Sequence, residues 1–274
     1  MLARTTALLS VILASVAHAD VTYSDGTFAP TDWGFQVAVT GIASGSASQR
    51  TTGGNPDFCR RLTNTVTSAS GGTVWSFSRF GTTFDTRYVA AEQGEILSID
   101  FSIDSRVVQA SSQNQEILPA LKQATVVYAA APGATTPGGG WSTYSVTGLT
   151  ASDFQPILGA GPPPDFSVFG APIRFGFIAK NSSTGSAFTM IVDYDNYFVR
   201  VVPPPCDSID FNRDEIFPDN QDLLDFLLVF SGGACPTDPP VGNGCNDIDF
   251  NNDQIYPDSA DLELFLLVFG GGTC

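Results

Sequence analysis

Histidine is almost absent from this chain of 274 residues, in which His18 is the single example. It lies in the segment Met1–Ala19, which has Arg4 near its start, continues with an apolar run and ends in Ala-His-Ala. This is the pattern of a cleaved export signal, and the mature chain is expected to begin at Asp20. That chain cannot build a Ser-His-Asp or Cys-His site, a histidine-ligated zinc site or a histidine general base. Catalysis would have to depend on carboxylates, tyrosine, lysine or a cation.

Basic residues are also scarce: the chain has 12 Lys and Arg against 28 Asp and Glu, for a formal net charge of −16. From Cys206 onward there are 14 acids, and Arg213 is the only base. Phosphate backbones and anionic membrane surfaces require a basic face, so the composition argues against nucleic acid and lipid headgroups as partners. The apolar runs of the tail are far shorter than the roughly 20 residues that span a bilayer, so we do not expect an integral membrane protein.

The most informative feature that is present is a duplication at the C-terminal end. Residues 206–235 read CDSIDFNRDEIFPDNQDLLDFLLVFSGGAC, and residues 245–274 read CNDIDFNNDQIYPDSADLELFLLVFGGGTC. The same five polar positions recur in both copies. A pattern that is repeated within a chain is stronger evidence than a motif that occurs once. These positions are Asp210, Asn212, Asp214, Asp219 and Asp222 in the first copy, and Asp249, Asn251, Asp253, Asp258 and Asp261 in the second.

Oxygen-bearing side chains at alternate positions of a loop are the ligands that Ca²⁺ prefers, as in EF-hand loops. We therefore expect two Ca²⁺ sites, one in each copy. A second interpretation remains open for two residues of each copy. Asp219 and Asp258 could cap a helix, with Asp222 and Asp261 at its third position, as in an acidic capping box.

A short apolar helix is predicted after each loop. In both copies the apolar residues follow the spacing i, i+3, i+4, i+7, and glycines end the run. The predicted stripes are Leu223, Phe226, Leu227 and Phe230, and Leu262, Phe265, Leu266 and Phe269. Neither helix could bury its stripe alone, so the two copies are expected to pack against each other.

The duplicated loop and helix resemble the type I dockerin module, in the cysteine-bounded form found at the C-terminus of secreted bacterial proteins. The resemblance covers the last quarter of the chain and implies Ca²⁺-dependent folding and attachment to a scaffold or cell-surface protein. Two features differ from the family: Glu215 and Gln254 replace the usual glycine, and one residue is added before the closing acids.

Cysteine usage agrees with export into an oxidising compartment. Cys206, Cys235, Cys245 and Cys274 bound the two copies, so the simplest pairing joins the two cysteines of each copy, although sequence alone allows other connectivities. Each such bridge would close a loop of about 30 residues. Cys59 is left over, either as a buried thiol or as one half of an intermolecular bridge.

Residues 20–202 are expected to form one all-β domain, an antiparallel β-sandwich of about eight strands and most simply a jelly roll. Residues 203–205 form a proline linker to the tail at 206–274. Alternating or β-branched runs separated by turn residues carry the strand prediction, at 33–39, 74–77, 96–103, 124–130, 173–178 and 188–202. Residues 132–140 and 159–164 are expected to be exposed loops, and residues 149–154 a single helical turn.

The segments 173–177 and 193–199 resemble the last strands of jelly-roll domains related to carbohydrate-binding modules. Asp193 and Asp195 either hold a structural cation or lie at a strand bend. The three tryptophans could include a sugar-stacking platform, but a tryptophan on a strand of a sandwich is more often in the core, as expected for Trp33 and Trp75. Trp141 follows three glycines and is the one least suited to the core.

These observations favour a secreted, non-catalytic Ca²⁺-binding protein, located outside the cell, on its surface or in the periplasm. Its β-sandwich would bind a polysaccharide or another ligand, and its tail would serve for attachment. The alternative is a glycoside hydrolase, which needs two facing carboxylates. Its candidates are Glu92, Glu95, Glu116, Asp100, Asp104, Asp193 and Asp195. A third possibility is a surface-layer or adhesin-like structural protein.

Overall fold

The computed structural model describes residues 21–67, 71–81, 86–111, 114–131, 133–167, 169–204, 206–214, 216–235, 245–252 and 255–272. The chain divides into two compact units, one of residues 20–203 and one from Pro204 onward. The export signal, the expected first residue Asp20, the metal-ligand candidate Asp253 and the disulfide candidate Cys274 lie outside the described residues.

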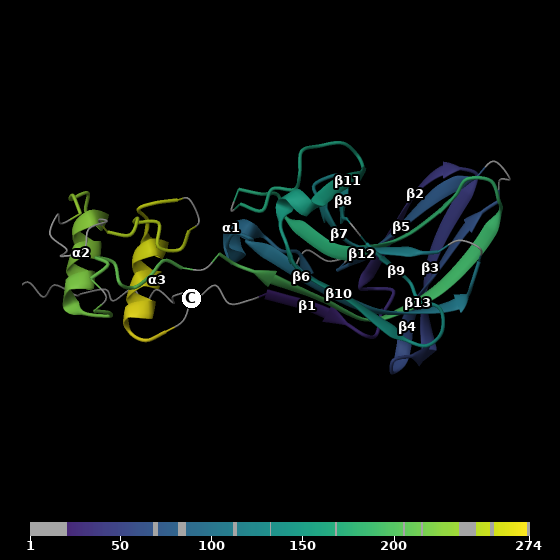
Figure 1. Cartoon of the computed structure of the whole chain (residues 1–274), viewed down its shortest axis with the longest axis horizontal. Helices are drawn as coiled ribbons and strands as arrows, with labels where there is room; N and C mark the ends of the chain where they lie inside the picture. Colours follow the sequence, from purple (N-terminus) through teal and green to yellow (C-terminus); the bar gives the residue numbers. More distant parts are fainter. Residues whose placement is uncertain are drawn as a thin grey trace, which may run out of the picture. The chain divides into compact units, whose positions relative to one another are not determined.

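The first unit consists of two antiparallel sheets that form a sandwich (Figure 1). Sheet A has six strands. Five follow the order β10 (Ser142–Leu149), β6 (Ser98–Gln109), β13 (Phe188–Val202), β4 (Asp57–Val66) and β3 (Ala43–Gly54), and β1 (Val21–Asp25) pairs with β13.

Sheet B has seven strands. Six follow the order β11 (Phe154–Leu158), β8 (Val126–Ala130), β7 (Glu116–Gln123), β12 (Ile173–Ser183), β5 (Gly72–Phe80) and β2 (Trp33–Gly41), and β9 (Ala134–Thr135) pairs with β7. The expected antiparallel β-sandwich is thus confirmed, with more strands than the eight or so predicted.

Alternation along the strands places large aromatic side chains between the sheets. Trp33, Phe177 and Tyr197 belong to one buried cluster, with the Trp33 ring 5.0 Å from that of Tyr197 and 5.9 Å from that of Phe177. The indole N–H of Trp33 donates to Asp25 Oδ2 at 2.6 Å, so its one polar atom is paired inside the unit. Each buried aromatic removes about 150–250 Å² from water, which makes this cluster a main source of stability.

The strand predictions fall on β2, β5, β6, β8, β12 and β13, and the helical turn is a 3₁₀ helix at Ala151–Asp153. The largest strand without a prediction is β3. It alternates Ala43, Gly45 and Ala47 on the inner side with serines outside, so no large apolar residue marks it. The segment expected as an exposed loop at 132–140 contains β9, and a short helix, α1 (Ala90–Gln93), lies where a turn was expected around Glu92.

In the tail, α2 (Asn220–Phe230) and α3 (Ser259–Phe269) lie side by side around a shared apolar core (Figure 1). The two copies also exchange main-chain hydrogen bonds: Asp207 N donates to Phe250 O, and its equivalent Asn246 N donates to Phe211 O. The expectation that one copy packs on the other is confirmed. None of the helices in the described part of the chain is long and apolar enough to cross a membrane.

The predicted apolar stripes are only partly buried. Phe226 and Phe265 are fully buried, but Leu227 and Leu266 are 40% and 45% exposed. Three of the buried positions on these helices are instead acids, Asp222, Asp225 and Asp261, and Asp222 and Asp261 take part in the loop geometry. Because both helices carry apolar residues on more than one face, spacing alone does not show which face is covered.

Candidate functional site

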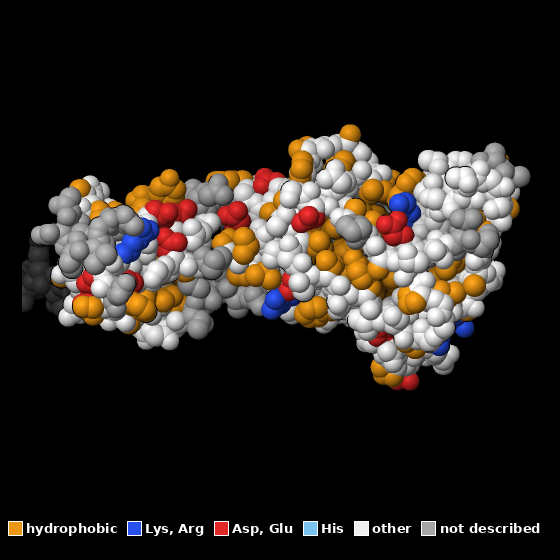
Figure 2. All heavy atoms as spheres, viewed as in Figure 1, with side chains coloured by type: hydrophobic (Ala, Val, Ile, Leu, Met, Phe, Trp, Pro, Cys, Tyr) orange, Lys and Arg blue, Asp and Glu red, His pale blue; other side chains and the backbone are white. Residues whose placement is uncertain are grey.

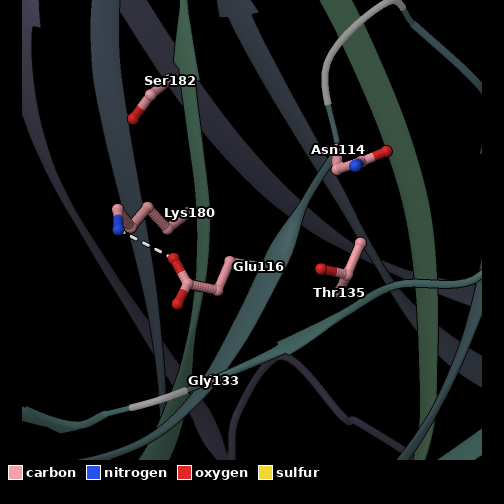
Figure 3. Close-up of a pocket in the computed structure, with 6 residues that line it drawn as sticks. All are labelled: Asn114, Glu116, Gly133, Thr135, Lys180 and Ser182. Atoms are coloured by element: carbon pink, nitrogen blue, oxygen red, sulfur yellow. Dashed lines mark hydrogen bonds and ion pairs between the residues drawn. The ribbon is translucent and has the colours of Figure 1, made fainter.

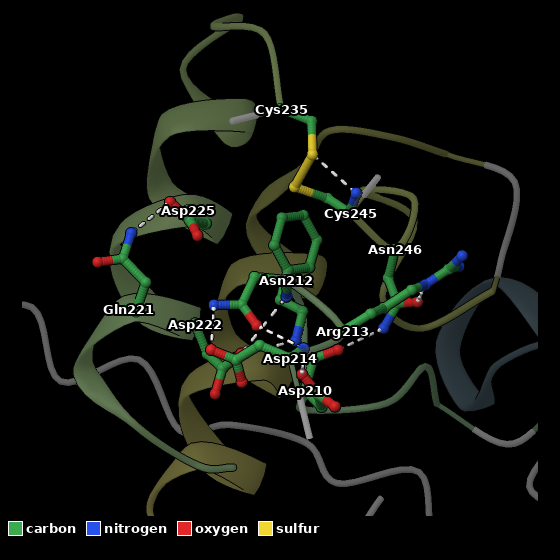
Figure 4. Close-up of a disulfide and its surroundings, with 11 residues drawn as sticks. Asp210, Asn212, Arg213, Asp214, Gln221, Asp222, Asp225, Cys235, Cys245 and Asn246 are labelled. Carbon is green, nitrogen blue, oxygen red and sulfur yellow. Dashed lines mark hydrogen bonds between the residues drawn. A yellow bond between two sulfur atoms is a disulfide. The ribbon is translucent and has the colours of Figure 1, made fainter. Parts of the chain in front are cut away.

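The first acidic loop is organised around the backbone N–H of Asp214 (Figure 4). This N–H donates to Asp210 Oδ1 at 3.0 Å and to Asn212 Oδ1 at 3.1 Å, while Asp214 Oδ1 accepts from Ile216 N at 2.8 Å. The structure therefore brings the three alternate side chains of the first loop close together. Asp249 and Asn251 occupy the equivalent positions of the second loop.

Asp222 ties the first loop to its helix. Its Oδ1 accepts from Phe211 N at 2.9 Å, and its Oδ2 accepts from Asp219 N at 3.0 Å. Burial raises the pKa of Asp222, and the N–H donors partly offset this effect. In the second copy Asp261 Oδ2 accepts from Asp258 N at 3.0 Å, and burial raises the pKa of Asp261 to about 6, with further contributions from Asp258 and Asp249.

Asp219 and Asp258 are the N-caps of α2 and α3, and both helices begin with a complete capping box. Their carboxylates face the first helical turn, with Asp219 Oδ1 accepting from Gln221 N at 2.7 Å. The capping interpretation thus accounts for the observed hydrogen bonds of these two residues. Among the described residues, no three His, Cys, Asp or Glu side chains are grouped so that they could hold a metal ion.

The expected pairing of cysteines within each copy is wrong. Cys235 and Cys245 form a disulfide with each other, across a sequence separation of 10 residues (Figure 4). Cys206 is in a disulfide as well. The reciprocal packing of the two copies explains the difference, because it brings the end of the first copy next to the start of the second. Cys59 is a free, buried cysteine, which agrees with the first of its two interpretations.

Three of the seven carboxylates proposed for a hydrolase, Asp193, Asp100 and Glu116, are held by basic side chains. Asp193 is buried and accepts from Arg61 Nε at 2.7 Å and from Arg106 Nη2 at 3.0 Å. Asp100 pairs with Arg200 at 2.6 Å. The two guanidinium groups account for the charge of Asp193, so this residue needs no structural cation.

Asp104 and Asp195 lie opposite each other on β6 and β13, where the register of β13 shifts. They are 7% and 1% exposed. Asp104 Oδ2 accepts from Asn55 Nδ2 at 3.0 Å and from Asn196 Nδ2 at 2.8 Å, and Asp195 accepts from the backbone N–H groups of both asparagines. Burial raises the pKa of Asp195, and the charges of Asp104 and Asp25 raise it further. This facing pair is too enclosed for a polymeric substrate to reach.

The outer face of sheet B is a second candidate region. The pairing of β7, β12, β5 and β2 arranges its outward residues in rows across the strands. The apolar row is Leu118, Ile178, Phe77 and Gln36, and the tryptophan row beside it is Glu116, Lys180, Trp75 and Ala38. Leu118, Ile178 and Phe77 are buried in a cluster that is separate from the core between the sheets, and the half-buried Trp75 packs against this cluster.

A depression of about 360 Å³ lies at the tryptophan row (Figure 3). Its lining is polar and comes from β7, β9, β12 and the adjacent loops: Asn114, Glu116, Gly133, Thr135, Lys180 and Ser182. Lys180 Nζ donates to Glu116 Oε2 at 2.7 Å, which keeps the two charges balanced. Both side chains are about one-third exposed, so they remain accessible to a ligand. The surface of the sandwich unit in the view of Figure 2 carries few charged side chains.

The three tryptophans have different positions. Trp33 is in the core, as expected. Trp141 is half-buried, and the guanidinium of Arg106 lies over its ring at 4.8 Å, so it covers the Asp193 ion pairs. Trp75 is on the outer face of sheet B and not between the sheets, which corrects the expectation from sequence. A four-residue alternating run identifies a strand but does not show which of its faces is inside.

No family model matches the chain, and no curated protein matches it. Solved structures to which it is similar include carbohydrate-binding modules. The family 11 module of the cellulosomal cellulase Lic26A-Cel5E of Clostridium thermocellum has 14% identity and a TM-score of 0.40, over 67% of this chain and 96% of that one. The C-terminal family 22 module of Clostridium thermocellum Xyn10B has 10% identity and a TM-score of 0.37, over 65% and 92%. The CBM22-1 xylan-binding domain of Paenibacillus barcinonensis Xyn10C has 10% identity and a TM-score of 0.34, over 70% and 98%.

Proposed function

We propose that the chain is an exported, non-catalytic protein that binds a polysaccharide on the outer face of sheet B and carries a Ca²⁺-binding, dockerin-like tail for attachment. The observation that carries the proposal is the tryptophan row. In this row the half-buried indole of Trp75 is on the strand next to Lys180, and the accessible ion pair of Lys180 with Glu116 lines a polar depression. Sugar-binding surfaces need both features, because an apolar ring face packs against the C–H groups of a sugar while polar groups pair with its hydroxyls.

The position of the site along a sheet suits an extended ligand. The apolar row and the tryptophan row are neighbours on four paired strands, and adjacent strands are about 4.8 Å apart. A chain of sugars could therefore lie along the tryptophan row and meet Glu116, Lys180 and Trp75 on successive strands. This geometry supports a polymer more than a single small molecule as the ligand.

The hydrolase alternative has weaker support. Its best-placed pair, Asp104 and Asp195, is buried, and Glu116 is neutralised by Lys180. A glycosidase needs two carboxyl groups that flank an accessible glycosidic bond, roughly 5–9.5 Å apart. The accessible carboxylate of the depression, Glu116, is not accompanied by a second acid among the described lining residues.

The Ca²⁺ sites of the tail are part of the proposal. In the first loop Asp210, Asn212, Asp214 and Asp222 supply the oxygens, and their counterparts Asp249, Asn251, Asp253 and Asp261 do so in the second. Their support is the convergence of the alternate side chains on Asp214 N and the burial of Asp222 and Asp261 beside these loops. A cation would compensate both the burial and the mutual repulsion of these carboxylates. Asp219 and Asp258 then serve as helix caps.

Attachment is assigned to the tail because it exposes large apolar side chains at equivalent positions of its two copies. Phe217 and Tyr256 are 59% and 60% exposed, and Ile216 beside Phe217 is 63% exposed. Exposed apolar side chains of this size are common in protein interfaces. The partner of this surface would be a scaffold or cell-surface protein.

The test of the sugar site is a comparison of two tryptophan variants of the full chain. Binding to cellulose, xylan, mixed-linkage β-glucan and agarose is measured by affinity electrophoresis, followed by calorimetry with the best ligand. Trp75→Ala should weaken binding about tenfold or more, since aromatic contacts at the centre of a site carry much of its free energy. Trp141→Ala is the matched control, because it also removes a half-buried tryptophan side chain, but one that lies near Asp193 and outside the proposed site. Absence of binding to all of these and to acidic polysaccharides, or equal effects of the two variants, would contradict the proposal.

A further inference from the structure

A second row of polar side chains crosses the outer face of sheet B beside the tryptophan row. Ser182 on β12 lies opposite Thr73 on β5, and Thr73 lies opposite Thr40 on β2. We call these three residues the hydroxyl row. Each of them is two residues away from a member of the tryptophan row on its own strand. The two rows therefore share one face of the sheet and are about 7 Å apart.

The hydroxyl groups of this row are accessible. Ser182 and Thr40 are exposed, and Thr73 is half-buried. The hydroxyl oxygens of Thr73 and Ser182 are 3.1 Å apart, and Thr40 Oγ1 accepts from Thr73 N at 3.0 Å. A hydroxyl donates once and accepts up to twice, so these contacts use only part of its hydrogen-bonding capacity. They also fix the positions of the oxygens, as recognition of a ligand with several hydroxyls requires.

The polar depression joins the hydroxyl row to the tryptophan row. Ser182 and Asn114 line it together with the ion pair of Glu116 and Lys180. In the view of Figure 3, Ser182 and Asn114 lie on the same side of this pair. The side chain of Asn114 is exposed, and its amide both donates and accepts. A ligand in the depression therefore meets neutral hydrogen-bonding groups next to the ion pair.

The opposite side of the tryptophan row is closed to a ligand. The neighbouring residues there are Leu118, Ile178 and Phe77, which are 5%, 0% and 0% exposed. Trp75 packs against this buried cluster with part of its side chain. A ligand that rests on Trp75 does not reach these apolar side chains, so its further contacts have to come from the hydroxyl row.

Charge is balanced at the two rows. Glu116 and Lys180 neutralise each other, with 2.7 Å between Oε2 and Nζ, and the other described members of the lining and of the hydroxyl row are uncharged. Arg79 and Lys122 lie on the same face, about 14 Å from Trp75 and about 20 Å from Glu116 along their strands, beyond the Debye length of about 8 Å at physiological salt. The net charge of −16 repels an anionic polymer at longer range.

We propose that the hydroxyl row and Asn114 form the second half of the sugar site, and that the ligand is an uncharged polysaccharide segment that lies across the strands. This inference rests on the proposed function and specifies its ligand. One sugar ring packs on Trp75, and the hydroxyls of this ring and its neighbours pair with the hydroxyl row. From β7 to β2 the four strands span three interstrand spacings, about 14 Å, which limits the bound segment to about three or four sugar units.

The first experiment removes hydroxyl groups from the full chain. Thr73→Val/Ser182→Ala deletes two hydroxyls of the row and leaves Trp75 in place. Affinity for xylan, mixed-linkage β-glucan, hydroxyethyl cellulose or agarose, whichever binds, should fall about tenfold in calorimetry, as expected for the loss of two hydrogen bonds between neutral groups. If the double variant melts early, Ser182→Ala alone, at an exposed position, should still weaken binding about threefold.

The matched control is Thr63→Val/Ser46→Ala. These two residues lie opposite each other on β4 and β3 of sheet A, and Thr63 is half-buried and Ser46 exposed, as are Thr73 and Ser182. The control thus removes the same groups at the same exposure from the other sheet. It should bind like the wild type.

The second experiment compares neutral and acidic polymers that share a backbone. The pairs are hydroxyethyl and carboxymethyl cellulose, agarose and κ-carrageenan, and linear xylan and glucuronoxylan. The acidic member should bind no tighter than its neutral partner. Raising the salt from about 0.1 M to about 1 M should change the affinity for the neutral polymer less than about twofold, because salt screens charges only. Oligosaccharides cut from the bound polymer should gain affinity up to about four units and little beyond, since the four strands span about 14 Å.

The inference fails, and the proposed sugar site stands, if Trp75→Ala weakens binding whereas the hydroxyl variants do not, or if the sheet A control loses as much affinity as they do. It also fails if an acidic polymer binds tighter than its neutral partner, or if affinity is the same for one sugar unit as for four. Absence of binding to every polysaccharide would overturn both the inference and the proposed function.

Discussion

Phe226 and Phe265 stack face to face, with ring centroids 3.9 Å apart and planes inclined by 13°. They occupy the same position in the two copies of the tail, so the two copies pack against each other through equivalent residues. Phe211 and Phe250, another equivalent pair, meet these rings edge-on at 5.2 and 5.1 Å. The stability of the tail thus depends on both copies together.

We predict that Phe226→Ala or Phe265→Ala destabilises the tail by about 3–5 kcal/mol, the usual range for a buried phenylalanine. Both α-helical copies should then unfold together, because neither has a separate core. The matched control is Phe217→Ala in the same unit, which removes an exposed ring and should have little effect. Thermal unfolding followed by helical circular dichroism provides the measurement. Equal effects of the buried and exposed substitutions would contradict the shared core.

Ca²⁺ is expected to stabilise the tail and not the sandwich. A cation that binds only the folded loops adds about 2.7 kcal/mol at a hundredfold excess over its Kd. Asp210→Ala/Asp249→Ala should reproduce the effect of a chelator on limited proteolysis, and Asp247→Asn, outside the proposed ligand set, should not. All three tryptophans lie in the sandwich, so tryptophan fluorescence reports that unit alone. A tail that takes up no Ca²⁺ at millimolar concentration in calorimetry would leave only the capping role of its acids.

The free thiol of Cys59 should be inert in the folded protein. Burial raises its pKa to about 11, and the nearby charges of Asp193 and Asp195 add to this effect. Little thiolate is therefore present at a pH of about 8, and the sulfur is enclosed. A thiol reagent should modify one cysteine after denaturation and almost none before it. Rapid modification of the native protein would contradict this.

Mass spectrometry of the unreduced protein should recover a peptide that joins Cys235 to Cys245. Replacing both with serine should destabilise the tail by about 2–3 kcal/mol in the chain-entropy model, since the bridge closes a short loop. A bridge from Cys235 to Cys206 would restore the pairing within one copy and contradict the structure.

The stability of the sandwich should depend on pH through Asp195. Its folded pKa is raised, so its contribution is fully present below the unfolded value of about 3.9 and is lost as the pH rises through the folded value. The wild type should therefore lose stability relative to Asp195→Asn as the pH increases from about 3.5 to about 7. Thermal unfolding of both proteins across this range measures the difference. A constant difference, or one of the opposite sign, would contradict the raised pKa.

No hydrolysis of bound polysaccharide is expected from the purified chain. The facing pair Asp104 and Asp195 is enclosed, and Glu116 is held by Lys180. Release of reducing sugar is measured over long incubation with each ligand that binds. Reproducible release that is lost in Asp104→Asn or Glu116→Gln would establish the hydrolase alternative.

Features that depend on local spacing could be predicted from the sequence alone. The duplication, the capped helices that follow each acidic loop, and the strands with alternating large residues can all be read within a few positions, because capping and periodicity act over short distances. The strand β3 could not be predicted in this way, since its alternation uses only small side chains, which give a weak hydrophobic signal.

Which distant residues meet depends on the tertiary structure. Cys235 pairs with Cys245 because the two copies pack reciprocally, and Trp75 lies outside the core because of the face that β5 presents to the other sheet. Arg79, Lys122 and Arg174 are far apart in the sequence, and strand register brings them to one end of the outer face of sheet B. Register depends on the burial of whole sheet faces, a global property that no short stretch of sequence contains.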